Sequence, residues 1–311
     1  MLVANKKHIR VGTRGSPLAR SQAGLVIQQL CNTHDINQNL CELVVIPTSG
    51  DKLAGDLSGY EGIKGLFTKE LDEALLSGTI DLAVHSMKDV PTAQSARLSI
   101  AAILQRDDPR DAFLSHTASS INTLGSGAVV GTSSVRRRAL LLWQRPDLQV
   151  IPFRGNIHTR LNKLERGEVD ATLLANAGLK RLGLAKEATA VLSAEEMPPS
   201  AAQGAIGIGC RDDDSELKML VEAINDPHST AEVHAERALL SSLDGSCQTP
   251  IAALAILKEN NLWLRATIIQ PDGSIRHDGE RNGTASDAYN LGHDLGAELR
   301  ERGGSDFFSV V

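Results

Sequence analysis

The chain has 311 residues, which is enough for two or three domains with cores of their own. Its formal net charge of −6 argues against a general nucleic-acid binder, because wrapping a phosphate backbone needs a broad basic face. No uninterrupted apolar run approaches the roughly 18 residues of a membrane span, and residues 1–8 lack the apolar core of a signal peptide. We therefore expect a cytoplasmic protein with no membrane or nucleic-acid partner.

Strands and helices alternate along the first two thirds of the chain. An apolar strand at residues 8–13 leads into a helix that Ser16 and Pro17 open and that carries Gln22. The next expected elements are strands at 42–47, 81–85 and 98–104, with an amphipathic helix at 66–76. Residues 48–65 contain five glycines, which is typical of a mobile lid.

A second lobe repeats this design. Its strands are expected at 128–131, 149–153 and 171–174, with helices between them. Val-Gly-Thr ends a strand at Val11–Thr13 and at Val130–Thr132, which suggests two lobes built alike. The alternation indicates largely parallel sheets, whose ligands lie beyond the carboxyl ends of the strands. Four residues follow such ends and are expected to share one cleft: Arg14, His85, Thr132 and Arg154.

Two connections are expected to join the lobes. One is the charged segment 106–110, and the other follows Pro198 and Pro199 and returns through a short strand at 205–209. The remaining pattern is a helix at 230–243, strands at 251–257 and 262–269, and a helix at 285–302. The expected division is a first lobe of residues 1–105 and 203–222, a second lobe of 106–202, and a small α+β C-terminal domain of 223–311.

Residues 131–160 concentrate positive charge in an acidic chain. Its segments 131–138 and 154–160 hold five arginines, and a helix expected at 135–143 begins there with free N–H groups and the positive end of its dipole. Arginine suits bidentate recognition of carboxylate or phosphate, and each charge-assisted contact contributes roughly 1.5–3 kcal/mol. The alternative for an isolated arginine triplet is a solvated helix face, and we interpret Arg138 as such a surface residue.

The four cysteines include no C-x-x-C pair, so neither a zinc site nor a disulfide framework is indicated, and we expect no metal and reduced thiols. Free cysteines are usually small buried hydrophobes, which suffices for Cys31, Cys41 and Cys210. Cys247 differs because it follows a polar turn at 244–246 from which its sulfur can reach outward. A thiolate there is a natural nucleophile toward an electrophilic carbon.

Six segments form an ordered set of motifs: Ala83-Val-His-Ser-Met-Lys-Asp-Val-Pro91, Gly131-Thr-Ser-Ser-Val-Arg-Arg137, Arg154-Gly-Asn-Ile-His-Thr-Arg160, Ala177-Gly-Leu-Lys-Arg-Leu-Gly183, Gln203-Gly-Ala-Ile-Gly207 and Gly245-Ser-Cys-Gln248. Together they resemble the porphobilinogen deaminase family from Arg10 into the C-terminal domain. The resemblance implies two periplasmic-binding-protein-like lobes, joined by a double hinge, and a third domain. It also implies a transferase of haem and porphyrin biosynthesis that condenses four porphobilinogen molecules head to tail into hydroxymethylbilane and releases ammonia.

The resemblance further implies a monomer with a dipyrromethane cofactor attached to Cys247 by a thioether, which binds porphobilinogen and the growing oligopyrrole chain. The implied catalytic residues are Asp89, Arg14 and Lys88. The implied cofactor-binding residues are Cys247, Ser16, Lys88, Asp89, Thr132, Ser133, Ser134, Arg136, Arg137, Arg154 and Gly155. The implied substrate-binding residues are Arg14, Gln22, Lys64, Phe67, Arg154, Arg160, Arg181 and Gln203. Because every porphobilinogen ring carries an acetate and a propionate, the arginines suit a polycarboxylate ligand.

Asp89 is the expected catalytic carboxylate. Loss of ammonia from porphobilinogen gives a cationic azafulvene, and its condensation with a pyrrole carbon gives a second cation that must lose a proton. A carboxylate near the pyrrole nitrogens would stabilise both cations and assist the proton transfer. From the residues alone, Asp89 equally suits a cap of the turn before Val90 and Pro91, and it is the resemblance that favours catalysis.

Two positions depart from the family's pattern. Tyr60 stands where related enzymes often have a second lysine, which leaves open how the expected lid contributes charge. Ser246 replaces a common glycine beside Cys247.

A different class of protein also has two similar lobes, namely a small-anion-binding protein without catalysis. That interpretation predicts an export signal or a DNA-binding helix pair, and neither is seen in the sequence. It also gives Cys247 no purpose.

Overall fold

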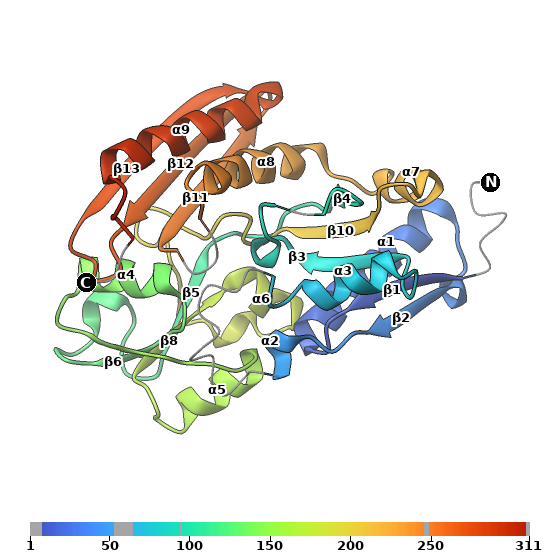
Figure 1. Cartoon of the computed structure of the whole chain (residues 1–311). Helices are drawn as coiled ribbons and strands as arrows, with labels where there is room; N and C mark the ends of the chain where they lie inside the picture. The colour runs from blue at the N-terminus through green and yellow to red at the C-terminus, as the bar shows by residue number, and fades with distance from the viewer. Residues whose placement is uncertain (1–7, 53–64, 94, 246–248, 309–311) are drawn as a thin grey trace. The chain divides into compact units, whose positions relative to one another are not determined.

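The computed structural model describes residues 8–52, 65–93, 95–245 and 249–308 (Figure 1). The chain forms two compact units. The first runs to Arg106 and resumes over Ala205–Thr230, and the second comprises Asp107–Gly204 and the chain from Ala231 onward. The chain therefore passes between the units after Arg106, after Gly204 and once more within the helix that follows Asp226.

The first unit is built on a five-stranded sheet. Its strands are β1 (Ile9–Thr13), β2 (Cys41–Val45), β3 (Leu82–Ser86), β4 (Leu98–Ile103) and β10 (Ile206–Arg211), in the order β2-β1-β3-β10-β4. Its helices are α1 (Pro17–His34), α2 (Ser49–Lys52), α3 (Lys69–Leu76) and α7 (Ser215–Glu222), with single turns η1 (Gln38–Leu40) and η2 (Met87–Asp89). Leu82 and Val84 pack among side chains of α1 and α7, whereas Ala83 packs among those of α3. Alternate residues of β3 therefore face opposite layers of helices.

The second unit begins with a lobe of similar design. Its strands are β5 (Asp111–Ser115), β6 (Val129–Gly131), β7 (Gln149–Ile151), β8 (Ala171–Ala175) and β9 (Ala190–Val191), in the order β7-β6-β8-β5-β9. Its helices are α4 (Val135–Gln144), α5 (Ile157–Glu165) and α6 (Asn176–Arg181), with turns η3 (Ile121–Thr123) and η4 (Ala185–Glu187). Phe113 packs with the buried face of α4, and Ala112 and Leu114 pack on the opposite side of the sheet.

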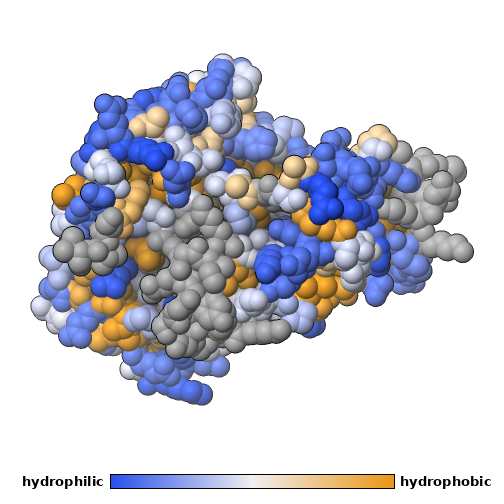
Figure 2. All heavy atoms as spheres, viewed as in Figure 1, coloured by the Kyte–Doolittle hydropathy of each residue, from blue (hydrophilic) through white to orange (hydrophobic). Residues whose placement is uncertain are grey.

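The same unit ends in an antiparallel sheet with helices on one side (Figure 1). Its strands are β11 (Ile251–Lys258), β12 (Asn261–Ile269) and β13 (Arg276–Thr284), and its helices are α8 (Pro227–Ser242), the turn η5 (Ala285–Asp287) and α9 (Ala288–Gly303). Leu239, Leu264 and Leu295 share one core. Figure 2 shows mainly hydrophilic residues along the outer side of α9, consistent with its amphipathic pattern. The expected fold of two α/β lobes and a small α+β C-terminal part is confirmed.

Two features differ from the sequence analysis. Both five-stranded sheets are mixed, because β10 and β5 run antiparallel to their neighbours. Each of these strands follows a connecting segment instead of a crossover helix, so nothing forces it to run parallel. The strand β13 was not expected, because its nine residues are almost all polar and show no apolar alternation. Its backbone pairing with β12, from Arg276 opposite Ile269 onward, defines it instead.

Close contact between α8 and α9 depends on glycine. An added Cβ on Gly292 would overlap the carbonyl oxygen of Ala235, and one on Gly296 would lie 2.8 Å from the carbonyl oxygen of Leu239. Backbone atoms cannot move aside as the end of a side chain can. We therefore predict that Gly292→Ala lowers the free energy of unfolding by about 1–3 kcal/mol, as overpacked sites do, in denaturant titrations.

Gly24 provides the matched control. It is exposed on α1, and nothing lies within 4 Å of an added Cβ. Gly24→Ala is therefore expected to leave stability unchanged or raise it by about 0.5–1 kcal/mol, since alanine is the better helix former. Equal effects of the two substitutions would show that the α8–α9 contact is looser than the structure indicates.

Candidate functional site

The first unit contains a pocket where the ends of β1 and β3 meet the start of α1. Ser16 caps α1, with its Oγ accepting from the N–H of Ala19 at 3.2 Å, and so fixes the chain just after Arg14. Six residues expected from the sequence line this one pocket: Arg14, Ser16, Gln22, Phe67, Lys88 and Asp89. The structure therefore brings together residues that lie up to 75 positions apart in the chain.

Asp89 and Phe67 both contact Arg14 at this pocket. Its Nη1 lies 3.8 Å from Oδ2 of Asp89, and its guanidinium carbon lies 4.1 Å from the centre of the Phe67 ring. A cation over an aromatic face is attracted by the ring quadrupole, so both partners orient the same guanidinium. The side chains of Arg14 and Asp89 are 21% and 27% exposed, which leaves both reachable from the pocket.

His85 and Ser86 add polar groups to the pocket wall. The amide of Gln22 and the hydroxyl of Ser86 form reciprocal hydrogen bonds of 2.9 and 3.1 Å. Burial and the nearby charge of Arg14 lower the pKa of His85 to about 4, so its imidazole is neutral at neutral pH. The sequence places His85 in the expected cleft with Arg14, but neither His85 nor Ser86 is among the implied catalytic or binding residues. Both residues belong to the same short motif as Lys88 and Asp89, and this proximity is the sequence signal that could have indicated their place in the pocket.

The second unit holds the other expected residues around the starts of α4 and α5. Ser134 caps α4 and Asn156 caps α5, each accepting from a backbone N–H of the first turn. Gly155 has φ of +120°, and an added Cβ would lie 2.7 Å from Thr159 Cγ2, so the turn before α5 requires glycine. The hydroxyls of Thr132 and Ser133 accept from the N–H groups of Ser134 and Phe153.

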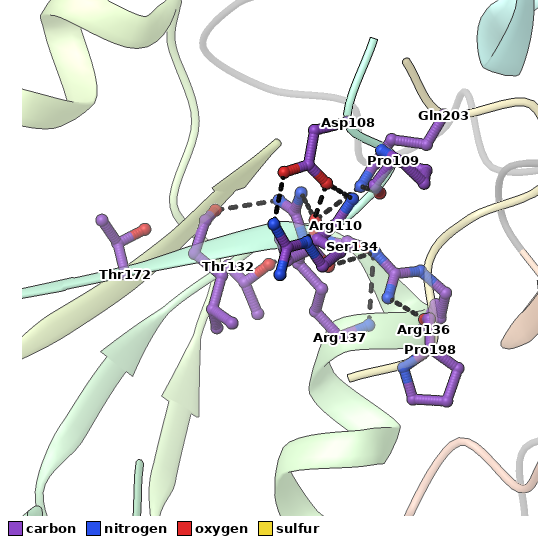
Figure 3. Close-up of polar contacts among 12 residues, drawn as sticks. Asp108, Pro109, Arg110, Thr132, Ser134, Arg136, Arg137, Thr172, Pro198 and Gln203 are labelled. Carbon is purple, nitrogen blue, oxygen red and sulfur yellow. Dashed lines mark hydrogen bonds and ion pairs between the residues drawn. The ribbon is translucent and has the colours of Figure 1, made fainter. Parts of the chain in front are cut away.

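Figure 3 shows Arg136 and Arg137 at the start of α4, and both side chains are almost fully buried within the second unit. Both pair with Asp111, their Nη2 atoms each lying 2.7 Å from one of its oxygens. The two guanidiniums hold the pKa of Asp111 well below its usual range despite its burial. The stabilisation from this carboxylate is therefore present above its unfolded pKa near 4 and is lost as the pH falls below it. Arg138 is exposed, as expected.

Three further arginines of the second unit were expected to bind ligand. Arg160 donates from Nε to the carbonyl of Gly155 at 2.9 Å, and burial together with the charge of Arg137 lowers its pKa to about 10. Arg181 donates to the carbonyl of Gly204 at 2.5 Å. The Nη1 atom of Arg154 is buried without a hydrogen-bond partner among the described residues. Gln203 donates to Asp111 at 2.8 Å.

This arrangement fits an anionic cofactor bearing carboxylates. Within the described residues, Nε of Arg136 and Nη1 of Arg154 are buried donors that no protein acceptor satisfies. An unsatisfied buried donor costs about 1–3 kcal/mol, and more when it is charged. Carboxylate oxygens would satisfy such donors and neutralise the excess positive charge of the arginines.

Several expected positions lie outside the described residues, namely Lys64, Tyr60, Ser246 and Cys247. The segment that leads toward Cys247 is described as far as Gly245, and Asp244 there has φ of +50° in a tight turn after α8. No set of three metal-binding side chains gathers anywhere in the described parts of the chain. Nor does any helix described by the structure have the length and apolar character to cross a membrane.

Some solved structures resemble the chain distantly. The crystal structure of the methionine binding protein MetQ matches 71% of this chain and 91% of its own, with 16% identity and a TM-score of 0.45. An ABC transporter periplasmic substrate-binding protein from Coxiella burnetii matches 72% of this chain and 94% of its own, with 18% identity and a TM-score of 0.44.

Sequence relatives are much closer. The model of the porphobilinogen deaminase dipyromethane cofactor binding domain matches residues 9–219, and that of the C-terminal domain matches 230–301. Porphobilinogen deaminase of Paracoccus denitrificans is 50% identical over 96% of both chains, and that of Nitrobacter winogradskyi is 48% identical over 96% of this chain and 95% of its own. The chloroplastic enzyme of Oryza sativa is 47% identical over 97% of this chain and 86% of its own. The chain therefore belongs to the porphobilinogen deaminase family.

Proposed function

We propose that the chain condenses four porphobilinogen molecules head to tail into hydroxymethylbilane, with release of ammonia, and that the pocket around Arg14 and Asp89 is where rings are joined. It is thus a transferase of tetrapyrrole biosynthesis, a hydroxymethylbilane synthase. The observation that carries this proposal is the convergence of six expected residues on one pocket with a partly exposed carboxylate beside an arginine.

Asp89 is suited to a reaction that builds positive charge on pyrrole rings. Its carboxylate lies at the end of the turn η2 and remains accessible, so it can face a cation and accept a proton from a ring. Arg14 can bind a ring carboxylate while its contacts with Asp89 and Phe67 keep it oriented. Lys88 lines the same pocket and supplies a further cation.

In the second unit, Arg136, Arg137, Arg154 and Arg160 would hold the dipyrromethane and chain carboxylates, with Ser133 and the start of α4 supplying neutral donors. When bound, the dipyrromethane supplies a free pyrrole carbon that accepts the first ring. We propose Cys247 as its point of attachment. The unsatisfied donors of Arg136 and Arg154 support carboxylate binding here.

The alternative of a two-lobed anion-binding protein without catalysis is not favoured. It would explain the buried arginines, but it would leave the Arg14–Asp89 pair and its pocket without a purpose. Family membership also argues against it.

We also propose that the protein acts in the cytoplasm as a monomer with three domains, comprising residues 1–105 with 203–222, residues 106–202 and residues 223–311. The thiols of Cys31, Cys41 and Cys210, which form no disulfide, support a reducing compartment. Light scattering coupled to gel filtration checks the monomer, since a mass near 66 kDa, about twice that of one chain, would contradict it.

Asp89→Asn keeps the shape of the side chain and removes its charge. We expect a folded protein that joins rings at least roughly 10²-fold more slowly, the scale of losing one acid–base or electrostatic group. Single-turnover rates with porphobilinogen measure this, and circular dichroism checks the fold. A variant that turns over at nearly the wild-type rate would exclude Asp89 from the chemistry.

Arg154→Gln removes a guanidinium that has an unsatisfied buried donor. Losing one charge-assisted contact of about 1.5–3 kcal/mol predicts a roughly 10- to 100-fold drop in kcat/KM. Exposed Arg138→Gln is the control and should leave kcat/KM within a few-fold of wild type. Equal losses in both variants would show a general electrostatic effect instead of a specific contact.

The covalent cofactor makes the most direct test. Purified protein should exceed the mass of the encoded chain by one dipyrromethane unit, and the excess should map to the peptide that contains Cys247. Cys247→Ala should fold but lack both the adduct and product formation, whereas Cys31→Ala and Cys210→Ala should keep both. An adduct on another cysteine, or an active Cys247→Ala protein, would overturn the proposed attachment.

A further inference from the structure

Asp111 lies at the centre of the buried arginines, although nothing in its sequence context marked it as a site residue. It is the first residue of β5 and is 0% exposed. Its Oδ1 accepts from Nη2 of Arg137 at 2.7 Å and from the amide of Gln203 at 2.8 Å. Its Oδ2 accepts from Nη2 of Arg136 at 2.7 Å and from Nε of Arg137 at 3.2 Å. Both oxygens are thus occupied by protein donors, so Asp111 has little capacity left for a ligand.

The two guanidiniums are also held from their other sides. Nη1 of Arg136 donates to the carbonyl of Pro198 at 2.6 Å (Figure 3). Nη1 of Arg137 donates to the carbonyl of Leu173 at 2.8 Å. Each plane is therefore fixed by Asp111 together with a backbone oxygen. Such double anchoring removes the rotamer freedom that an arginine otherwise loses on binding an anion.

Charge distinguishes this cluster from an ordinary structural ion pair. One carboxylate faces two guanidiniums, and Arg160 is close enough to Arg137 for their charges to repel. Burying an excess of positive charge is costly, and apolar residues in such places are often as stabilising as the ions. Nε of Arg136 also lacks a partner within the described residues. The arrangement is explained if an external anion completes it.

We propose that Asp111 is a positioning residue that holds Arg136 and Arg137 in the orientation that binds carboxylates of the dipyrromethane, without touching that group itself. This inference rests on the proposed function of the second unit. In this proposal Asp111 orients the two arginines, and the arginines contact the ligand.

The test compares Asp111→Asn and Asp111→Glu with the wild type. The matched control is Asp108→Asn, which removes a nearby carboxylate that accepts from Arg110 at 2.9 and 2.8 Å and is not part of the cluster. The readout is the fraction of folded protein that carries the adduct, from intact mass spectra after expression well below each variant's unfolding temperature. We expect the wild type and Asp108→Asn to load equally, Asp111→Asn to load at least about tenfold less, and Asp111→Glu, which keeps the charge, to recover part of the loading.

A purely structural role would give a different result. Asp111→Asn would then unfold at a lower temperature, but every folded molecule would carry the adduct, and that outcome overturns the proposal. If Asp111→Asn does not fold, Asp111→Glu decides, since loading equal to wild type would overturn the proposal and reduced loading would support it.

Failure of the proposed function can be told apart from failure of this inference. A wild-type protein without any adduct would contradict the proposed function. Porphobilinogen titrated into wild type and the Asp111 variants by calorimetry would then still test the positioning role, because the ligand carries two carboxylates. Equal affinities would overturn it, and weaker binding by the variants with unchanged binding by Asp108→Asn would support it.

Discussion

Burying positive charge inside an acidic chain is the constraint on which the second unit depends. A buried guanidinium is stable only where carboxylates, carbonyls or ligand oxygens replace the water it has lost. The second unit meets this need with carboxylate and carbonyl oxygens of its strands and turns. Arg137 uses a carbonyl of β8 and a carboxylate at the start of β5, and Arg160 uses the carbonyl of Gly155.

The two carboxylates that face arginines have different environments. Asp111 is fully buried, accepts four hydrogen bonds and keeps its partners fixed. Asp89 is partly exposed and lies 3.8 Å from Arg14, a distance longer than a tight ion pair. In the proposed reaction, Asp89 would face a new ring at each condensation. The looser pairing suits Asp89 to reaction chemistry, and the saturated pairing suits Asp111 to holding geometry.

The sequence allowed most of the fold to be predicted where local signals are strong. Ser16 and Pro17 mark the start of α1, and apolar runs mark β1 and β3. The polar strand β13 was not predicted from the sequence, because only its pairing with β12 defines it. The burial of Arg136 and Arg137 was also not predicted, because it depends on a partner that is distant in the sequence. Their partner Asp111 is 25 residues away from Arg136, and sequence proximity alone cannot distinguish a buried arginine from the exposed Arg138.

Near neutral pH, the charges of His85 in the first unit and of Asp111 and Arg160 in the second unit do not change. His85 titrates at about 4 in the folded chain and near 6.5 when unfolded, so the unfolded state binds more protons between these values. Its contribution to stability is complete above about pH 6.5 and is lost as the pH falls toward 4. The lowered pKa of Asp111 acts in the same direction at still lower pH, and that of Arg160, about 10, lies above the neutral range. Neither His85 nor Arg160 changes charge between the pKa values of about 4 and about 10. Over this pH range the electrostatic field around these side chains therefore depends on their positions, which the neighbouring carboxylates and carbonyls fix.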